Sequence, residues 1–445
     1  MTEYNPAPSP SGHPLLSGPP TSADIHQIFT SGEGPAIGIP MRNFSMPAHW
    51  ANAAYKCAAR LRSMWSPPVY KQHTCETIQR LHVTPAVLAG SNGAAGQTVA
   101  IVDEGEASFL HYAQMPSGAL KLLGTIDARP GEQAGTFAPN KARQGLKPRG
   151  RGCTVEEWNN HVAKTAAFAY WSEPTHMPTA RATCPTLGHA NMSAHGTSLV
   201  SVRFANRLYV AEGGSRPTPL LLDQYISGLV LALQSVLRHR KVLRITTVQI
   251  SAVDGIFKGA EYWEAAAPAK FARFRNLTQQ LARANVWVSA PTGNAYGADD
   301  VTRIGWPASN AGVIAVGCAT SSGAPDGNFS AEVGGVLAKI HVRPRRSPHA
   351  PNQLLTTSLQ PFTSQCNAII CATSMVAREL LARRCGVNPA AVPIAALRRA
   401  MMASARRVAD REIGSEHMLV VDDGSLYERL RIFDCAMISQ ARDTK

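Results

Sequence analysis

Short apolar runs alternate with longer helical stretches along most of this chain, and this alternation limits the folds open to it. The apolar runs are rich in β-branched residues and end at turn residues, as buried strands do. The predicted strands are 98–105, 207–212, 246–253, 287–294 and 311–320, and the predicted helices include 220–240 and 269–286. Strands separated by helices form βαβ units. We therefore expect an α/β fold with three αβα layers and a mostly parallel central sheet.

The chain divides unevenly. Its 445 residues, 44% of them hydrophobic, suffice for one large domain with extensions. Residues 1–45 are rich in Pro, Ser and Gly and are predicted to be disordered. Residues 46–75 are predicted to be a helical N-terminal extension. The main domain is expected at 76–445, with an irregular insertion at about 106–190.

Four polar residues stand where such a sheet collects its function, near the carboxyl ends of strands. Asp103 follows the apolar run AIV, and Asn294 follows WVSAPTG. His195 and Ser374 are each expected to begin a helix after a loop. An acid, an imidazole, an amide and an alcohol are the groups that acyl transfer needs, because a serine hydroxyl requires a base, the base an orienting carboxylate, and the oxyanion preorganised donors.

Each of these residues alone has an ordinary structural explanation. Asp103 and Asn294 can form turns, His195 can sit at a helix end, and Ser374 can be an N-cap. The catalytic interpretation depends on finding all four together and in this order.

In that order the four motifs resemble the subtilisin-like serine proteases, the subtilase or peptidase S8 family. The resembling segments are AIVDEG, AHGTSLVS, APTGN followed by GWPASNAG, and CATSMVAREL, and the resemblance covers about 76–410. It implies a subtilisin-like fold and a serine endopeptidase that cleaves peptide bonds through an Asp–His–Ser triad and an acyl-enzyme. By resemblance, Asp103 orients the base, His195 is the general base, Ser374 is the nucleophile and Asn294 donates to the oxyanion.

The resemblance also places a peptide-binding strand and pocket walls, at Ser251, Ala252, Val253 and Gly293. The sequence departs from the family at Glu104, Ala372 and Arg378, where the family has a small residue, a glycine and a proline. An alternative is therefore a catalytically impaired subtilase fold that binds extended peptides. No cofactor and no metal site are predicted; the resemblance leaves calcium possible, although the family's calcium sites match no residues here.

The net charge bears on the kind of partner that the protein binds. The net charge is +14, with basic clusters at 141–152 and 343–346 that could bind nucleic acid, but no aromatic residues are interleaved and no nucleic-acid motif occurs. Nucleic acid is therefore not the expected partner. The expected partner is a protein or peptide substrate, and the protein is expected to be a monomer. The apolar stretch 226–237 is too short for a membrane span and is predicted to be a buried helix.

The nine cysteines are odd in number and form no CxxC pair, which predicts free thiols in a reducing compartment rather than a disulfide framework. Cys371 is a rival nucleophile, three residues before Ser374. The N-terminus lacks the basic and apolar regions of a Sec signal peptide, so the default location is cytoplasmic. A non-classical export signal could still lie in that segment.

Overall fold

The computed structural model describes most of the predicted main domain. The described residues are 85–103, 120–131, 135–140, 194–205, 222–252, 259–293, 305–319, 336–339, 346–347, 350–354, 363–408, 418–421, 425–436 and 438, together with 162, 165, 166, 169 and 170. The predicted N-terminal segments 1–45 and 46–75, the predicted strand 207–212 and the basic cluster 141–152 lie outside them.

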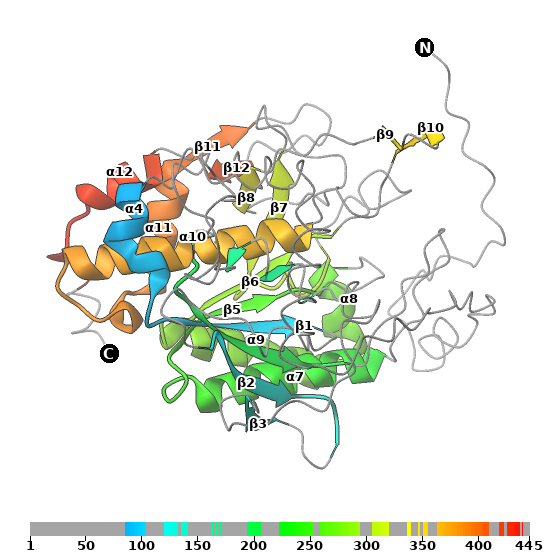
Figure 1. Ribbon diagram of the computed structural model, residues 1–445. Helices are drawn as coiled ribbons and strands as arrows, with labels where there is room; N and C mark the ends of the chain where they lie inside the picture. The colour runs from blue at the N-terminus through cyan, green and yellow to red at the C-terminus, as the bar shows by residue number, and fades with distance from the viewer. Residues whose placement is uncertain are drawn as a thin grey trace, which may run out of the picture.

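A mostly parallel sheet forms the centre of the molecule (Figure 1). The ten strands have the order β11-β12-β8-β7-β6-β5-β1-β4-β2-β3. Their bounds are β1 Thr98–Asp103, β2 Leu122–Asp127, β3 Thr136–Pro139, β4 Ser198–Arg203, β5 Ile245–Ile250, β6 Trp287–Pro291, β7 Ile314–Ala319, β8 Val336–Lys339, β11 Ala405–Val408 and β12 Met418–Val421. Neighbours from β2 to β12 pair in parallel, and only the edge strands β3 and β11 are antiparallel. A separate ribbon joins β9 (Arg346–Ser347) to β10 (Ala350–Leu354).

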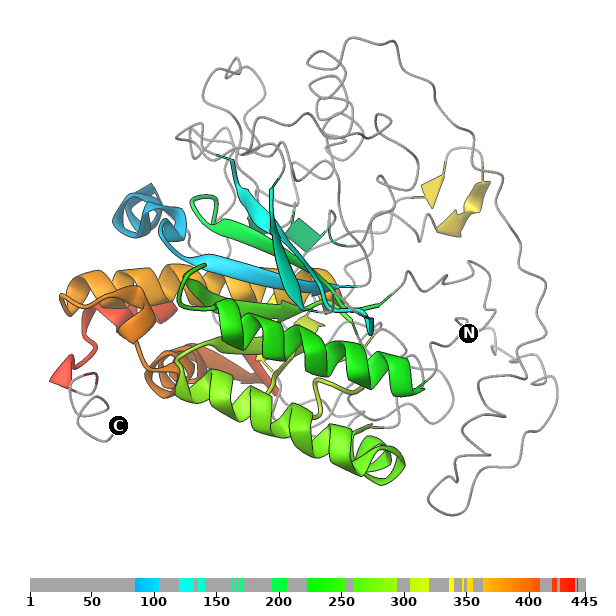
Figure 2. The ribbon, with the colours of Figure 1, turned by 90° about the horizontal axis from the view of Figure 1, so that it is seen from below.

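Helices cover both faces of this sheet, which confirms the expected three-layer fold. One face carries α7 (Leu222–His239), α8 (Gly259–Ala266) and α9 (Pro268–Arg283), and Figure 2 shows α7 and α9 side by side. The other carries α4 (Pro85–Ser91), α10 (Thr363–Arg384), α11 (Ile394–Ser404) and α12 (Ser425–Arg431). Across the described part of the chain, no helix is both long and apolar enough to cross a membrane.

Successive side chains of β1 pack against the helices on opposite faces of the sheet. All six residues are buried, and successive side chains point to opposite faces. Val99 and Ile101 belong to the cluster on the α10 face, whereas Ala100 and Val102 belong to the cluster on the α7 face. The same alternation directs the side chain of Asp103 to the α10 face.

Helices α7 and α9 form where the sequence predicts helices. In α9 the buried residues Phe271, Phe274, Leu277, Thr278 and Leu281 recur at helical spacing, and Pro268 occupies the first turn, where its missing N–H costs nothing. The predicted elements at 98–105, 220–240, 246–253, 269–286, 287–294 and 311–320 are confirmed within a few residues as β1, α7, β5, α9, β6 and β7.

The segment predicted as an insertion contributes two strands to the main sheet, so the expectation that it is irregular is wrong, and its being an insertion stays a prediction. Within 106–190, β2 and β3 pair with each other, and β2 also pairs with β4. The burial of β2 alternates along its length, as expected for a strand near a sheet edge. The run LLGTID contains glycine and is only half-buried, so it lacks the continuous apolar pattern by which β1 was predicted.

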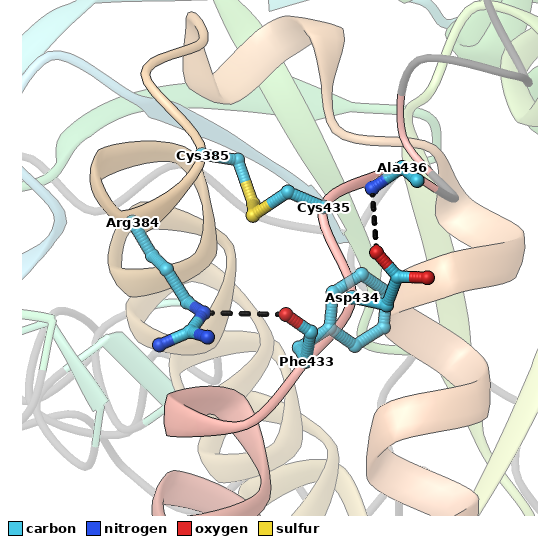
Figure 3. The surroundings of a disulfide bond; sticks show 6 residues. All are labelled: Arg384, Cys385, Phe433, Asp434, Cys435 and Ala436. Carbon is cyan, nitrogen blue, oxygen red and sulfur yellow. Dashed lines mark hydrogen bonds between the residues drawn. A yellow bond between two sulfur atoms is a disulfide. The ribbon is translucent and has the colours of Figure 1, made fainter.

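Disulfides contradict the prediction of free thiols. Cys385, just after α10, is bonded to Cys435 beyond α12, across a separation of 50 residues (Figure 3). In the same corner Arg384 Nε donates to Phe433 O at 3.2 Å. Cys366 is also disulfide-bonded, and Cys371 is the free cysteine among the described residues. Disulfides persist in oxidising compartments. The cysteines therefore no longer support the predicted cytoplasmic location.

Candidate functional site

Asp103 marks the carboxyl edge of the sheet at its centre. It ends β1, lies between β4 and β5, and is 2% exposed. Its carbonyl oxygen accepts from Phe204 N at 3.1 Å, and Ser251 N donates to Val102 O at 2.8 Å. These bonds extend the ladders on both sides, so the predicted carboxylate has a fixed position at this edge and faces the α10 layer.

The first turn of α10 reaches the same edge and face. Thr363 Oγ1 accepts from Gly293 N, just past β6, at 3.3 Å. Ser364 follows at the second position of the helix and is 6% exposed. The N–H groups of a first helical turn have no partners within the helix, and the helix dipole makes this end positive. Ser364 therefore has the helix-start environment that the sequence assigned to Ser374.

Ser374 does not begin a helix, and that prediction is wrong. α10 is continuous from Thr363 to Arg384, so Ser374 lies ten residues after Ser364, about 15 Å along the helix axis. Its side chain has no exposed surface and donates to Cys371 O at 2.7 Å. Its neighbour Met375 accepts through its carbonyl from Gln97 Nε2, and Gln97 precedes β1.

That contact places Ser374 near the amino end of β1. Asp103 lies at the other end, and the six-residue strand spans about 16 Å between its end residues. The structure therefore does not bring Ser374 to Asp103, and a buried hydroxyl bonded to its own helix is structural.

His195 also lies at the amino edge, so it does not meet Asp103 either. It precedes β4 instead of opening a helix, and Gly196 N donates to Gly93 O at 2.8 Å. Lys121 Nζ donates to His195 O at 2.6 Å and to Thr197 O at 2.8 Å. Burial lowers the pKa of Lys121 to about 7. The residues after His195 form a strand because the run LVSV is β-branched and buried.

A different histidine precedes a helical segment on the α10 face. Residues 162, 165, 166 and 169 are helical, and Val162, Ala166 and Tyr170 belong to the same cluster as α10. Ala194 N, at the amino edge, donates to Ala169 O at 3.3 Å. Ala169 therefore lies at the amino edge, and Val162 comes seven residues earlier in the chain. His161 directly precedes Val162 in sequence and lies outside the described residues.

The remaining predicted site residues fall at the carboxyl edge or just beyond the described residues. Ser251 and Ala252 follow β5 and are buried, and the Ser251 hydroxyl accepts from Gln249 Nε2 at 2.7 Å. Gly293 follows β6 with φ of 118°, a value that favours glycine. Asn294 and Val253 lie outside the described residues, immediately after Gly293 and Ala252. Their roles toward a substrate stay predictions.

The rival nucleophile and two departures from the family pattern are buried inside the fold. Burial raises the pKa of Cys371 to about 12, which keeps the thiol protonated. Ala372 has no exposed surface in mid-helix. Arg378 is fully buried, and its guanidinium donates to four backbone carbonyls, including Asn285 O at 2.7 Å. Glu104 lies outside the described residues.

No group of three or more His, Cys, Asp or Glu side chains among the described residues is placed to hold a metal ion. The absence of a cofactor stays a prediction, and calcium stays possible by the family resemblance alone.

No family model and no curated protein matches the sequence. Solved structures similar to this chain include the PatG macrocyclase in complex with peptide, at 15% identity and a TM-score of 0.46, covering 78% of this chain and 97% of that one. They also include the prenylagaramide maturation protease PagA, at 16% identity and a TM-score of 0.45, covering 77% and 96%. The α/β fold itself follows from the sheet order and the two helical layers.

Proposed function

We propose that this protein is a serine endopeptidase of the subtilisin-like kind, with Ser364 as its nucleophile. One observation carries the proposal: α10 begins against Gly293, at the same sheet edge and on the same face as Asp103. The chain contains two Thr-Ser pairs in this helix, at 363–364 and 373–374, and only the first lies in its N-terminal turn.

The residues divide the chemistry as follows. Ser364 Oγ attacks the scissile carbonyl while His161 takes its proton, and Asp103 stays ionised and stabilises the imidazolium. The oxyanion accepts from the Ser364 backbone N–H and from the Asn294 side-chain amide. His161 then protonates the leaving amine, the C–N bond breaks, and water releases the acyl group from Ser364 by the reverse sequence.

The substrate is proposed to be an extended peptide. Beyond the last β5–β6 pair, the carboxyl end of β5 continues into Ser251 and Ala252. Backbone groups past this point can pair with an added strand, which holds a peptide by main-chain hydrogen bonds. Gly293 offers no side chain to block the approach.

The test uses a fluorophosphonate probe, which reacts with a serine activated by its base and oxyanion donors. Wild-type protein, Ser364→Ala and Ser374→Ala are compared, with circular dichroism to confirm folding. We expect the wild type and Ser374→Ala to be labelled and to cleave a peptide library, and Ser364→Ala to do neither. His161→Ala should abolish labelling as well.

Two results would overturn the proposal. Labelling of folded Ser364→Ala would move the nucleophile elsewhere. Absence of labelling in folded wild-type protein would favour the alternative, a peptide-binding subtilase fold without catalysis.

A further inference from the structure

A chain of buried, uncharged hydrogen bonds lies directly beneath the proposed nucleophile. It includes Asn367, which is fully buried and one helical turn after Ser364, on the same side of α10. Asn367 Nδ2 donates to Ile250 O at 2.8 Å and to Ser289 O at 3.4 Å, and its Oδ1 accepts from Ser289 Oγ at 2.7 Å. One side chain thus ties α10 to both β5 and β6.

These contacts occur where β5 and β6 separate. The last residues paired between the two strands are Gln249 and Ser289. Ile250 O comes next along β5, and Asn367 supplies the donor that a neighbouring strand would otherwise provide. The amide therefore enters the sheet at the point where the carboxyl edge opens.

A second set of buried hydrogen bonds connects Tyr170, just after the helical residue Ala169, to the end of β5. Tyr170 Oη donates to Gln249 Oε1 at 2.7 Å, and Gln249 Nε2 donates to Ser251 Oγ at 2.7 Å. Ser289 Oγ also lies 3.0 Å from Cys371 Sγ on α10. Tyr170 is thus tied to β5, and α10 is tied to both β5 and β6.

We propose that Asn367 is a positioning residue, whose side chain fixes the height of α10 above β5 and β6 so that Ser364 keeps its reactive geometry. The proposal rests on Ser364 being the nucleophile. An apolar side chain would fill the same space but would let the helix slide, since apolar packing lacks the directional preference of hydrogen bonds. A displacement of 1 Å can slow catalysis by about 100-fold.

The chain offers a matched control at the other end of α10. Gln97 is also a buried amide, and its Nε2 donates to Met375 O at 2.9 Å while its Oε1 accepts from Thr246 Oγ1 at 3.0 Å. It lies at the amino edge of the sheet, away from Ser364. Gln97→Ala therefore removes comparable hydrogen bonds without loosening the first turn of the helix.

The experiment measures the rate constant of fluorophosphonate labelling, kcat and KM for wild type, Asn367→Ala and Gln97→Ala. We expect Asn367→Ala to lower the labelling rate and kcat by about 10- to 100-fold with KM nearly unchanged, and Gln97→Ala to change them less than about threefold. Both variants should lower the melting temperature. If Asn367→Ala does not fold, Ser289→Ala removes one partner of the amide and should slow labelling by about tenfold.

Labelling of Asn367→Ala, or of Ser289→Ala, at the wild-type rate would overturn the positioning role. Equal losses of rate in Asn367→Ala and Gln97→Ala would do the same, because they would indicate a general effect of stability. Failure of the wild type to be labelled at Ser364 is a separate outcome, and it would refute the proposed function itself.

Discussion

Lys121 gives the protein a pH-dependent stability that can be measured. Its ammonium group is fully buried, and its hydrogen bonds run to the carbonyls of His195 and Thr197 with no carboxylate among them. Burial lowers its pKa from 10.5 to about 7. Because one pKa unit corresponds to about 1.4 kcal/mol, the charged form is destabilised by about 5 kcal/mol in the folded protein.

The direction of the effect follows from proton counting. Between pH 7 and 10.5 the unfolded chain keeps the Lys121 proton and the folded chain releases it. The free energy of unfolding therefore rises with pH through this window, and the penalty is fully present below it. Between pH 6.5 and 9.5 the lysine should contribute an increase of about 3 kcal/mol.

Lys121→Met isolates this contribution. It removes the titrating group and leaves two carbonyl oxygens without their donor, a cost that does not depend on pH. Urea unfolding of both proteins at several pH values should show the wild type gaining about 3 kcal/mol relative to the variant from pH 6.5 to 9.5. Lys241→Met replaces an exposed lysine and keeps Lys121, so it should show the same gain with pH as the wild type. A constant difference between wild type and Lys121→Met would refute the reasoning.

Three further predictions concern the supports of the fold. Arg378→Met should lower the free energy of unfolding by roughly 2–4 kcal/mol in urea, because its backbone carbonyl partners lose their donor; a neutral or stabilising result would contradict this role. Replacing Cys385 and Cys435 by serine should cost up to about 4 kcal/mol, from the 50-residue separation, and a reducing agent should lower the melting temperature of the wild type by more than that of the double variant, which keeps only the disulfide of Cys366 among these cysteines. Gly93→Ala should cost roughly 1–3 kcal/mol in the same assay, since a Cβ there would lie 2.6 Å from His195 ring atoms; an unchanged midpoint would show that the ring moves aside.

The strands and helices with strong periodicity could be predicted from the sequence. β1, α7, β5, α9, β6 and β7 each bury a continuous run or a helical stripe, and that pattern is visible without a structure. Asp103 was found because it ends such a run. β2 was missed because its burial alternates and it contains glycine, and the disulfide pairing was missed because cysteine spacing does not determine which thiols meet.

Ser374 was wrongly placed at a helix start because residue letters were weighed above helix periodicity. CATSMVAREL matches the family motif in composition, but the preceding QCNAIICA has no breaker, so the helix extends back to Thr363. The pair Thr363–Ser364, which follows Pro361, was the available signal for a helix start. His195 was chosen for the letters His-Gly-Thr, although the β-branched run after it favours a strand.

The position of a fluorophosphonate adduct tests the central claim most directly. Trypsin releases 347–378 as one peptide that contains both Ser364 and Ser374, and fragment ions that break between them assign the modified serine. The account predicts that the adduct lies on Ser364 in wild-type protein. An adduct on Ser374, or no adduct on folded protein, would contradict it.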